Sequence, residues 1–231
     1  WKHYYEYGNT FAFKPKFIIK NNELQLINNQ IDNKEKFYEY EKFLPKIKKY
    51  DYFYFKKFKK EKIQFPYLIT ILKNPKRNLR IISKVIFKEL SKKNKEKKEY
   101  DLMNIIMEIN LKWRLKLFEN YNAITLLNKI IKEFVTFSEK NNFQPVFIFL
   151  PQKDDLIFIK KKYNFMKKTI NEITNITKIN YVDIIDEFLE SQNLDEYYSD
   201  DNDYGGHFSK EGNEKIASII KKELTKKGIL S

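Results

Sequence analysis

The chain has 231 residues, of which 42% are hydrophobic and 33% charged, so it is long and apolar enough to bury a core. It contains no cysteine, which excludes disulfides, thiolate catalysis and cysteine-ligated zinc. The net charge is +14, but only three of the 45 basic residues are arginine, the side chain that nucleic-acid readout favours, so nucleic acid is not an expected partner.

Two features of the whole chain bear on its cellular location. The longest apolar runs, such as "VFIFL", are far shorter than the roughly 20 residues that a membrane-spanning helix needs. The sequence opens on Trp1 rather than on methionine, so we expect it to begin inside a longer chain, and its compartment stays open.

The first half of the chain predicts a β-hairpin followed by helices. In residues 14–28 two short runs rich in β-branched residues flank Asn21 and Asn22, which tolerate the positive φ of a tight turn. From residue 32 to about 120 apolar residues recur at three- and four-residue spacing, which indicates a mainly helical insertion or lid. Within it, the segment "YFKKFKKEK" interleaves aromatic and basic residues and is the best candidate for a surface that binds polyanions.

The second half, residues 121–231, predicts alternating helices and strands. An amphipathic helix over 123–141 precedes a buried strand within 144–152, and a second helix follows over 155–174, with Asp154 or Asp155 as its N-cap. A second strand or strand-to-helix segment lies in 179–186, and a last helix runs from Ser209 to Gly228. This is α/β order with parallel strands, but two strands are too few for a stable sheet, so the chain is expected to be the carboxyl-terminal part of a larger domain.

The loop before the last helix combines unusual residues. Gly205 and Gly206 allow a tight backbone ahead of His207, and three carboxylates precede them: Asp200, Asp201 and Asp203. A carboxylate that accepts from one imidazole nitrogen would leave the other nitrogen as a general base. Three interpretations are open here: a surface loop with an incidental histidine, a calcium loop running from Asp200 to Glu211 with Tyr204 breaking the pattern, and the acid and base of a hydrolytic triad.

The stretch "DYGGHFSKEGNEKIA", residues 203–217, resembles the last sequence block of the SGNH (GDSL-type) hydrolases. The segments "FKPKFIIKNNELQLINNQI" and "QPVFIFLPQ" are also similar to parts of one bacterial branch of that family. The family's usual spacing is Asp-x-x-His, whereas Tyr204 stands three residues before His207, so the acid role passes to Asp203, with Asp201 and Asp200 as alternatives.

The resemblance implies a three-layer α/β/α, flavodoxin-like fold with a parallel sheet, incomplete at its N-terminus and carrying the helical insertion. It implies hydrolysis or acyl transfer on a small acyl ester, such as an acetylated carbohydrate, with no metal and no organic cofactor. The sequence has no Gly-Asp-Ser block, so the nucleophile would lie outside these residues, and the chain alone is expected to be inactive. The alternative is a non-catalytic basic protein that binds polyanions or carbohydrate through its Lys-rich helices.

Overall fold

The computed structural model describes residues 15–50, 65–73, 75–91, 98–191, 193–199 and 205–230. The segment "YFKKFKKEK" and residues Asp200, Asp201 and Asp203 therefore lie outside the described residues. The chain divides into two compact units, Trp1–Lys95 and Glu96–Ser231, which are described separately below.

The first unit contains the predicted hairpin and short helices. Strands β1 (Lys16–Lys20) and β2 (Glu23–Ile27) pair antiparallel, and the connecting Asn21 and Asn22 have φ of 51° and 62°, as a two-residue primed turn requires. The described helices of this unit are α2 (Lys34–Tyr38), α3 (Tyr40–Tyr50), α5 (Tyr67–Lys73) and α6 (Pro75–Ser91). The expectation of helices without strands after residue 32 is confirmed for the described part of this unit.

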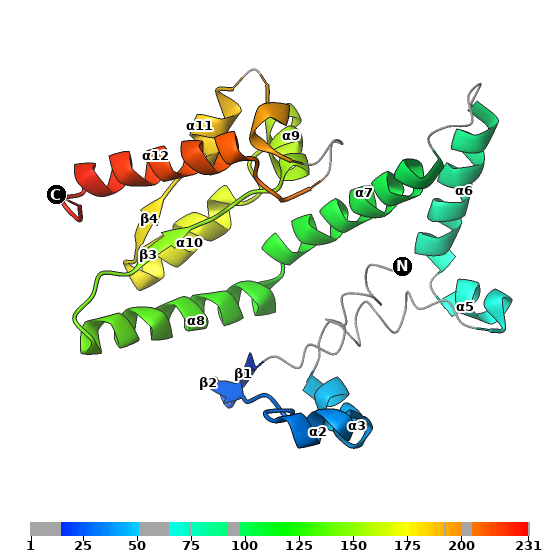
Figure 1. The fold of residues 1–231 in the computed structure, drawn as a ribbon, viewed down its shortest axis with the longest axis horizontal. Helices are drawn as coiled ribbons and strands as arrows, with labels where there is room; N and C mark the ends of the chain where they lie inside the picture. The colour runs from blue at the N-terminus through cyan, green and yellow to red at the C-terminus, as the bar shows by residue number, and fades with distance from the viewer. Residues whose placement is uncertain are drawn as a thin grey trace. The chain divides into compact units, whose positions relative to one another are not determined.

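The second unit has the predicted α/β order (Figure 1). Its elements are α7 (Lys98–Phe118), α8 (Tyr121–Lys140), β3 (Val146–Ile148), α9 (Lys153–Lys161), α10 (Lys167–Thr177), β4 (Asn180–Val182), α11 (Ile185–Leu189), the 3₁₀ turn η3 (Asp195–Tyr197) and α12 (Lys210–Lys226). Together with the hairpin, these elements make the protein a mixed α/β protein that is mainly helical.

Helices cover both faces of the small sheet formed by β3 and β4. The two strands are parallel, with Val146, Phe147 and Ile148 opposite Asn180, Tyr181 and Val182. Val146 and Ile148 pack with a core that includes Ile216 and Ile219 of α12, whereas Phe147 packs with Ile131 of α8 and Ile173 of α10. Because successive side chains of a strand point to opposite faces, β3 makes apolar contacts on both of its sides.

The strands are shorter and less buried than the sequence predicts. The run from residue 144 to 152 yields only three strand residues, and all three are half-buried instead of enclosed. The physical reason is that β3 has one hydrogen-bonded neighbour among the described residues, so only one of its edges is paired. Residues 179–186 follow the second of the two alternatives, a short strand that runs into a helix.

The single helix predicted over 155–174 is wrong, because the chain forms α9 and α10 with a break between them. The Asn164 Oδ1 accepts from the backbone N–H groups of Met166 and Lys167, both at 3.1 Å, and so starts α10. The N-cap of α9 is Gln152, and Asp155 acts three residues later, where its Oδ2 accepts from Gln152 N at 3.0 Å.

Helix α7 belongs to the second unit, although its spacing placed it with the helical insertion. Its last residue, Phe118, makes edge-to-face contacts with Phe149 and Phe165 at ring-centroid distances of 5.4 and 5.1 Å. These rings, together with the ionic contacts of Arg114 described below, join α7 to the α/β core.

Candidate active site at the carboxyl edge of the sheet

The loop that carries His207 lies against the turn that follows β3. The N–H of Lys153, the first residue of α9, donates to the Gly205 carbonyl at 2.8 Å. Since parallel strands end at the same edge, this bond places the loop at the carboxyl edge of the β3–β4 sheet, where ligands bind in open α/β sheets. The described residues of the loop next to His207 thus lie at the edge that the sequence predicts.

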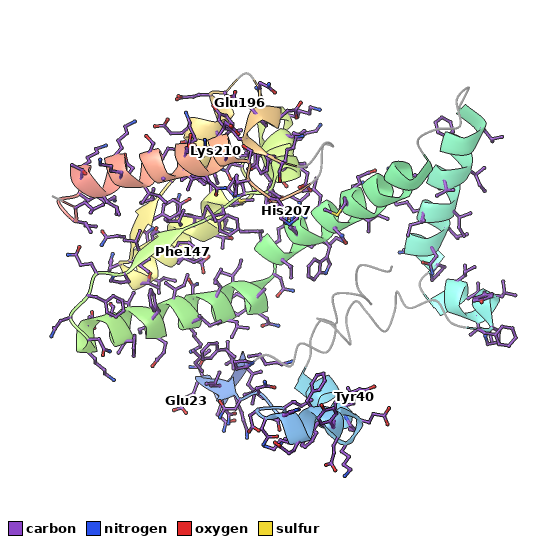
Figure 2. The ribbon with its side chains drawn as sticks, viewed as in Figure 1. Glu23, Tyr40, Phe147, Glu196, His207 and Lys210 are labelled. Carbon is purple, nitrogen blue, oxygen red and sulfur yellow. The ribbon has the colours of Figure 1, made fainter. Side chains whose placement is uncertain are left out.

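The backbone on both sides of His207 is held by the segment before it. Ser199 donates to the His207 carbonyl from its N–H at 2.9 Å and from its hydroxyl at 3.1 Å. Tyr198 and Phe208 form an isolated antiparallel bridge, and their rings lie 4.8 Å apart. Figure 2 shows His207 on the strand-like segment that leads directly into α12, and its side chain is exposed.

Backbone conformation and close packing explain why glycine stands at three positions of the motif. Gly205 has a φ of 152°, a conformation that side chains disfavour. A Cβ on Gly206 would lie 3.2 Å from Cγ of Gln152, and a Cβ on Gly212 would lie only 2.2 Å from the Tyr197 carbonyl oxygen. The glycine of the Ser-x-x-Gly motif therefore allows the first turn of α12 to pack closely against η3.

Ser209 completes that contact. Its Oγ accepts from Gly212 N at 3.0 Å, which caps the helix as predicted, and its hydroxyl donates to the Glu196 carbonyl at 2.6 Å. The hydrogen bonds of this one side chain thus fix both the beginning of α12 and its position against η3, and with them the exit of the His207 loop.

A buried ionic cluster lies in the same turn. Arg114 of α7 donates from Nη2 to Asp154 Oδ2 and, at 2.9 Å, to Asp155 Oδ1, which also accepts from its Nε at 3.1 Å. Both carboxyl groups are about 3% exposed. Burial raises the pKa of Asp154 to about 6, against the lowering effect of Arg114, and burial also raises the pKa of Asp155.

Two further contacts tie the turn to the segment around η3. Lys153 is buried, and its ammonium lies 2.6 Å from Oδ1 of Asp195. The buried Tyr198 hydroxyl donates to the Pro151 carbonyl at 2.9 Å, and burial with the nearby carboxylates Asp155 and Asp154 raises the Tyr198 pKa. Sequence reasoning missed this cluster, since it treated the aspartates as helix caps; the one visible signal was Arg114, one of only three arginines.

Of the remaining predicted site residues, some lie outside the described part of the chain. The carboxylates that would partner His207 lie outside the described residues, so Asp203, with Asp201 and Asp200 as alternatives, stays a prediction. Asp183 is explained by the start of α11, because its Oδ1 accepts from Ile185 N at 2.8 Å. Within the described ranges no group of three or more histidine, aspartate and glutamate side chains could hold a metal ion.

Comparison of the chain with protein-family models, with curated proteins and with solved structures gives no match. None of the helices in the described part of the chain is both long and apolar enough to cross a membrane. A functional assignment must therefore start from the loop itself and from its position in the fold.

Proposed function

We propose that this chain carries the general base of an SGNH-type serine hydrolase or acyl transferase that acts on a small acyl ester. The observation that carries the proposal is the Lys153 N–H bond to the Gly205 carbonyl, which holds the His207 loop at the carboxyl edge of a parallel sheet. Triad histidines in α/β folds work at that edge, directly beside the strand ends. The motif residues that resemble the family also have structural roles here, since Ser209 and Gly212 dock α12 beneath the loop.

In the proposed reaction His207 removes the proton from a serine hydroxyl as the serine oxygen attacks the ester carbonyl. His207 then returns the proton to the departing alcohol, and a water molecule or a second alcohol repeats the cycle on the acyl-enzyme. Asp203 would accept a hydrogen bond from the other ring nitrogen and stabilise the imidazolium. The serine would come from polypeptide outside these 231 residues.

The same proposal extends to the fold of the whole domain. Helices on both faces of a parallel pair, with α12 on one side and α8 on the other, are what a three-layer α/β/α, flavodoxin-like domain contains around two of its strands. In such a domain further strands would pair with the β3–β4 sheet.

The test uses the complete open reading frame that contains this sequence. The purified protein is assayed with acetate esters of p-nitrophenol and 4-methylumbelliferone and with an alkyl fluorophosphonate that labels activated serines. We expect His207→Ala to lower kcat/KM by at least about 10³-fold and to abolish labelling, because a triad without its base retains little nucleophile activation. His3→Ala is the matched control, since it removes the only other histidine of the chain.

Two results would defeat the proposal. The first is a reading frame without a serine on a strand-to-helix turn upstream of Trp1. The second is full esterase activity in the His207→Ala variant.

A second candidate function, polyanion binding, has one specific observation in its favour. Along α6 the basic positions Lys76, Arg80 and Lys84 follow one another at four-residue spacing, which places them on one side of the helix. Binding to heparin that weakens steeply with salt, and that falls when these three are replaced by glutamine, would support it. Replacement of three lysines of α12 is the control, and equal loss in both variants would count against a specific surface.

A further inference from the structure

Arg114 makes polar contacts with residues that follow β3, although it lies on a helix that precedes the α/β core in the sequence. It lies on α7, and its guanidinium reaches both acidic side chains of the first turn of α9, Asp154 and Asp155. The arginine side chain is 19% exposed, whereas the two carboxyl groups are almost completely enclosed. The contact is therefore internal to the unit.

The Arg114 guanidinium allows two carboxylates to be buried side by side in this turn. Two carboxylates side by side repel each other, and each loses hydration, so an opposite charge with matching geometry is needed to keep them in place. Asp155 accepts from Gln152 N through its other oxygen, while the second oxygen of Asp154 is buried without a hydrogen-bond partner. Lys153 points away from the pair, to Asp195 on η3.

The turn that Arg114 holds is also the turn that holds the His207 loop. Lys153 donates its N–H to the Gly205 carbonyl, Gly206 lies against the Gln152 side chain, and Tyr198 donates to the Pro151 carbonyl. Three consecutive residues, Pro151 to Lys153, thus contact both the glycines that precede His207 in the sequence and Tyr198, whose neighbour Ser199 is bonded to the His207 carbonyl. A shift of this turn moves the loop backbone with it.

We propose that Arg114 is a positioning residue for His207, acting through Asp154, Asp155 and the turn that precedes them. The inference rests on the proposed function only for its catalytic consequence, because the position of the imidazole can be observed without turnover. Arginine suits the task since its planar fork reaches two carboxylates at once, which a lysine ammonium does less well.

The test follows the imidazole of His207, one of the two histidines of this sequence. In the complete polypeptide labelled with ¹³C and ¹⁵N at histidine, the His207 resonances are assigned through His207→Ala. Arg114→Gln should displace or broaden the His207 resonances, while Arg114→Lys should give a smaller displacement. Lys112→Gln, which removes an exposed cation from the same helix, should leave these resonances unchanged.

Arg114→Gln alone leaves two buried carboxylates without their cation and can prevent folding. The double variant Arg114→Gln/Asp154→Asn removes the arginine together with one of those charges, so it retains the net charge of the cluster. It should fold and still show displaced His207 resonances, because Asp155 has lost its guanidinium. Wild-type His207 resonances in either folded variant would overturn the proposal.

The activity of the complete polypeptide separates this inference from the proposed function. If both hold, Arg114→Gln lowers kcat by roughly tenfold to a hundredfold with a smaller change in KM, as expected when a catalytic base is misplaced by about 1 Å. If the complete protein has no esterase activity but the His207 resonances respond to Arg114, the proposed function fails and the positioning role stands.

Discussion

The buried Asp154 carboxyl group makes the stability of the fold depend on pH. Burial raises its pKa to about 6 even though Arg114 contacts it. The folded protein therefore binds a proton on Asp154 at pH values where the unfolded chain has released it. By linkage, the free energy of unfolding must fall as the pH rises from about 4 to about 6, and it stays lower above that window.

We expect Asp154→Asn to remove this pH dependence, because the amide is neutral at every pH and its oxygen can still accept from Arg114. The variant should match the wild type near pH 4 and exceed it by about 1–3 kcal/mol at pH 7. Urea denaturation of both proteins across this pH range measures the difference.

Glu187→Gln gives a control of opposite sign. A hydrogen bond from Lys222 lowers the pKa of Glu187, so this carboxylate stabilises the fold at neutral pH, and the contribution disappears as the pH falls. The glutamine variant should be slightly less stable than wild type at pH 7 and equal to it in acid. A larger loss of stability at pH 7 than at pH 4 in Asp154→Asn would contradict the argument.

Gly212 provides a second test at the level of one residue. Alanine normally stabilises an α-helix over glycine by roughly 1 kcal/mol, but a Cβ at this position would lie 2.2 Å from the Tyr197 carbonyl oxygen. We expect Gly212→Ala to lower the free energy of unfolding by about 1–3 kcal/mol, because the backbone of η3 or of α12 must move. Thermal and urea denaturation measure the change, with the exposed Ser218→Ala in the same helix as the control. Equal or greater stability in Gly212→Ala would exclude the steric explanation.

At the scale of elements, the sequence predicts those parts whose signals are local. Asn21-Asn22 marks the hairpin, Ser209 and Gly228 mark the ends of the last helix, and apolar spacing marks α8. The prediction of one continuous helix missed the break between α9 and α10, because apolar residues recur on both sides of it. The break depends on Asn164, whose side chain turns back to accept from two N–H groups, as asparagine does at helix starts. No glycine or proline stands there to reveal it.

The hairpin turn itself makes a prediction. Both turn residues have positive φ, which glycine adopts with less strain than asparagine and a β-branched residue adopts at a high cost. We expect Asn22→Gly to slow amide hydrogen exchange in β1 and β2 by severalfold and Asn22→Val to accelerate it by tenfold or more. Lys20→Gln beside the turn is the control and should have little effect. Faster exchange in the glycine variant would show that the turn has another geometry.

At the scale of the whole molecule, the candidate site is held together by contacts between residues far apart in the sequence. For this reason the sequence predicts the His207 motif but not the contacts that position it. His207 and its glycines stand together in the sequence, so the motif was visible. Arg114 stands 40 positions before Asp154 and 41 before Asp155, so no local sequence pattern predicts their contact. The acidic partners of His207 stay a prediction for a different reason, since they lie outside the described residues.

The contacts that hold the His207 loop come from residues between Arg114 and Gly212, all within the unit Glu96–Ser231. We therefore expect deletion of residues 1–95 from the complete polypeptide to leave the His207 imidazole resonances at their original positions. The cores around β3 and β4 are built from the unit Glu96–Ser231, so the shortened polypeptide should still show a cooperative thermal transition by far-ultraviolet circular dichroism. Gly212→Ala in the shortened polypeptide is the control that should weaken this transition. Displaced His207 resonances in a folded deletion variant would mean that residues before 96 help to position the loop, and Arg114 would then share its role with them.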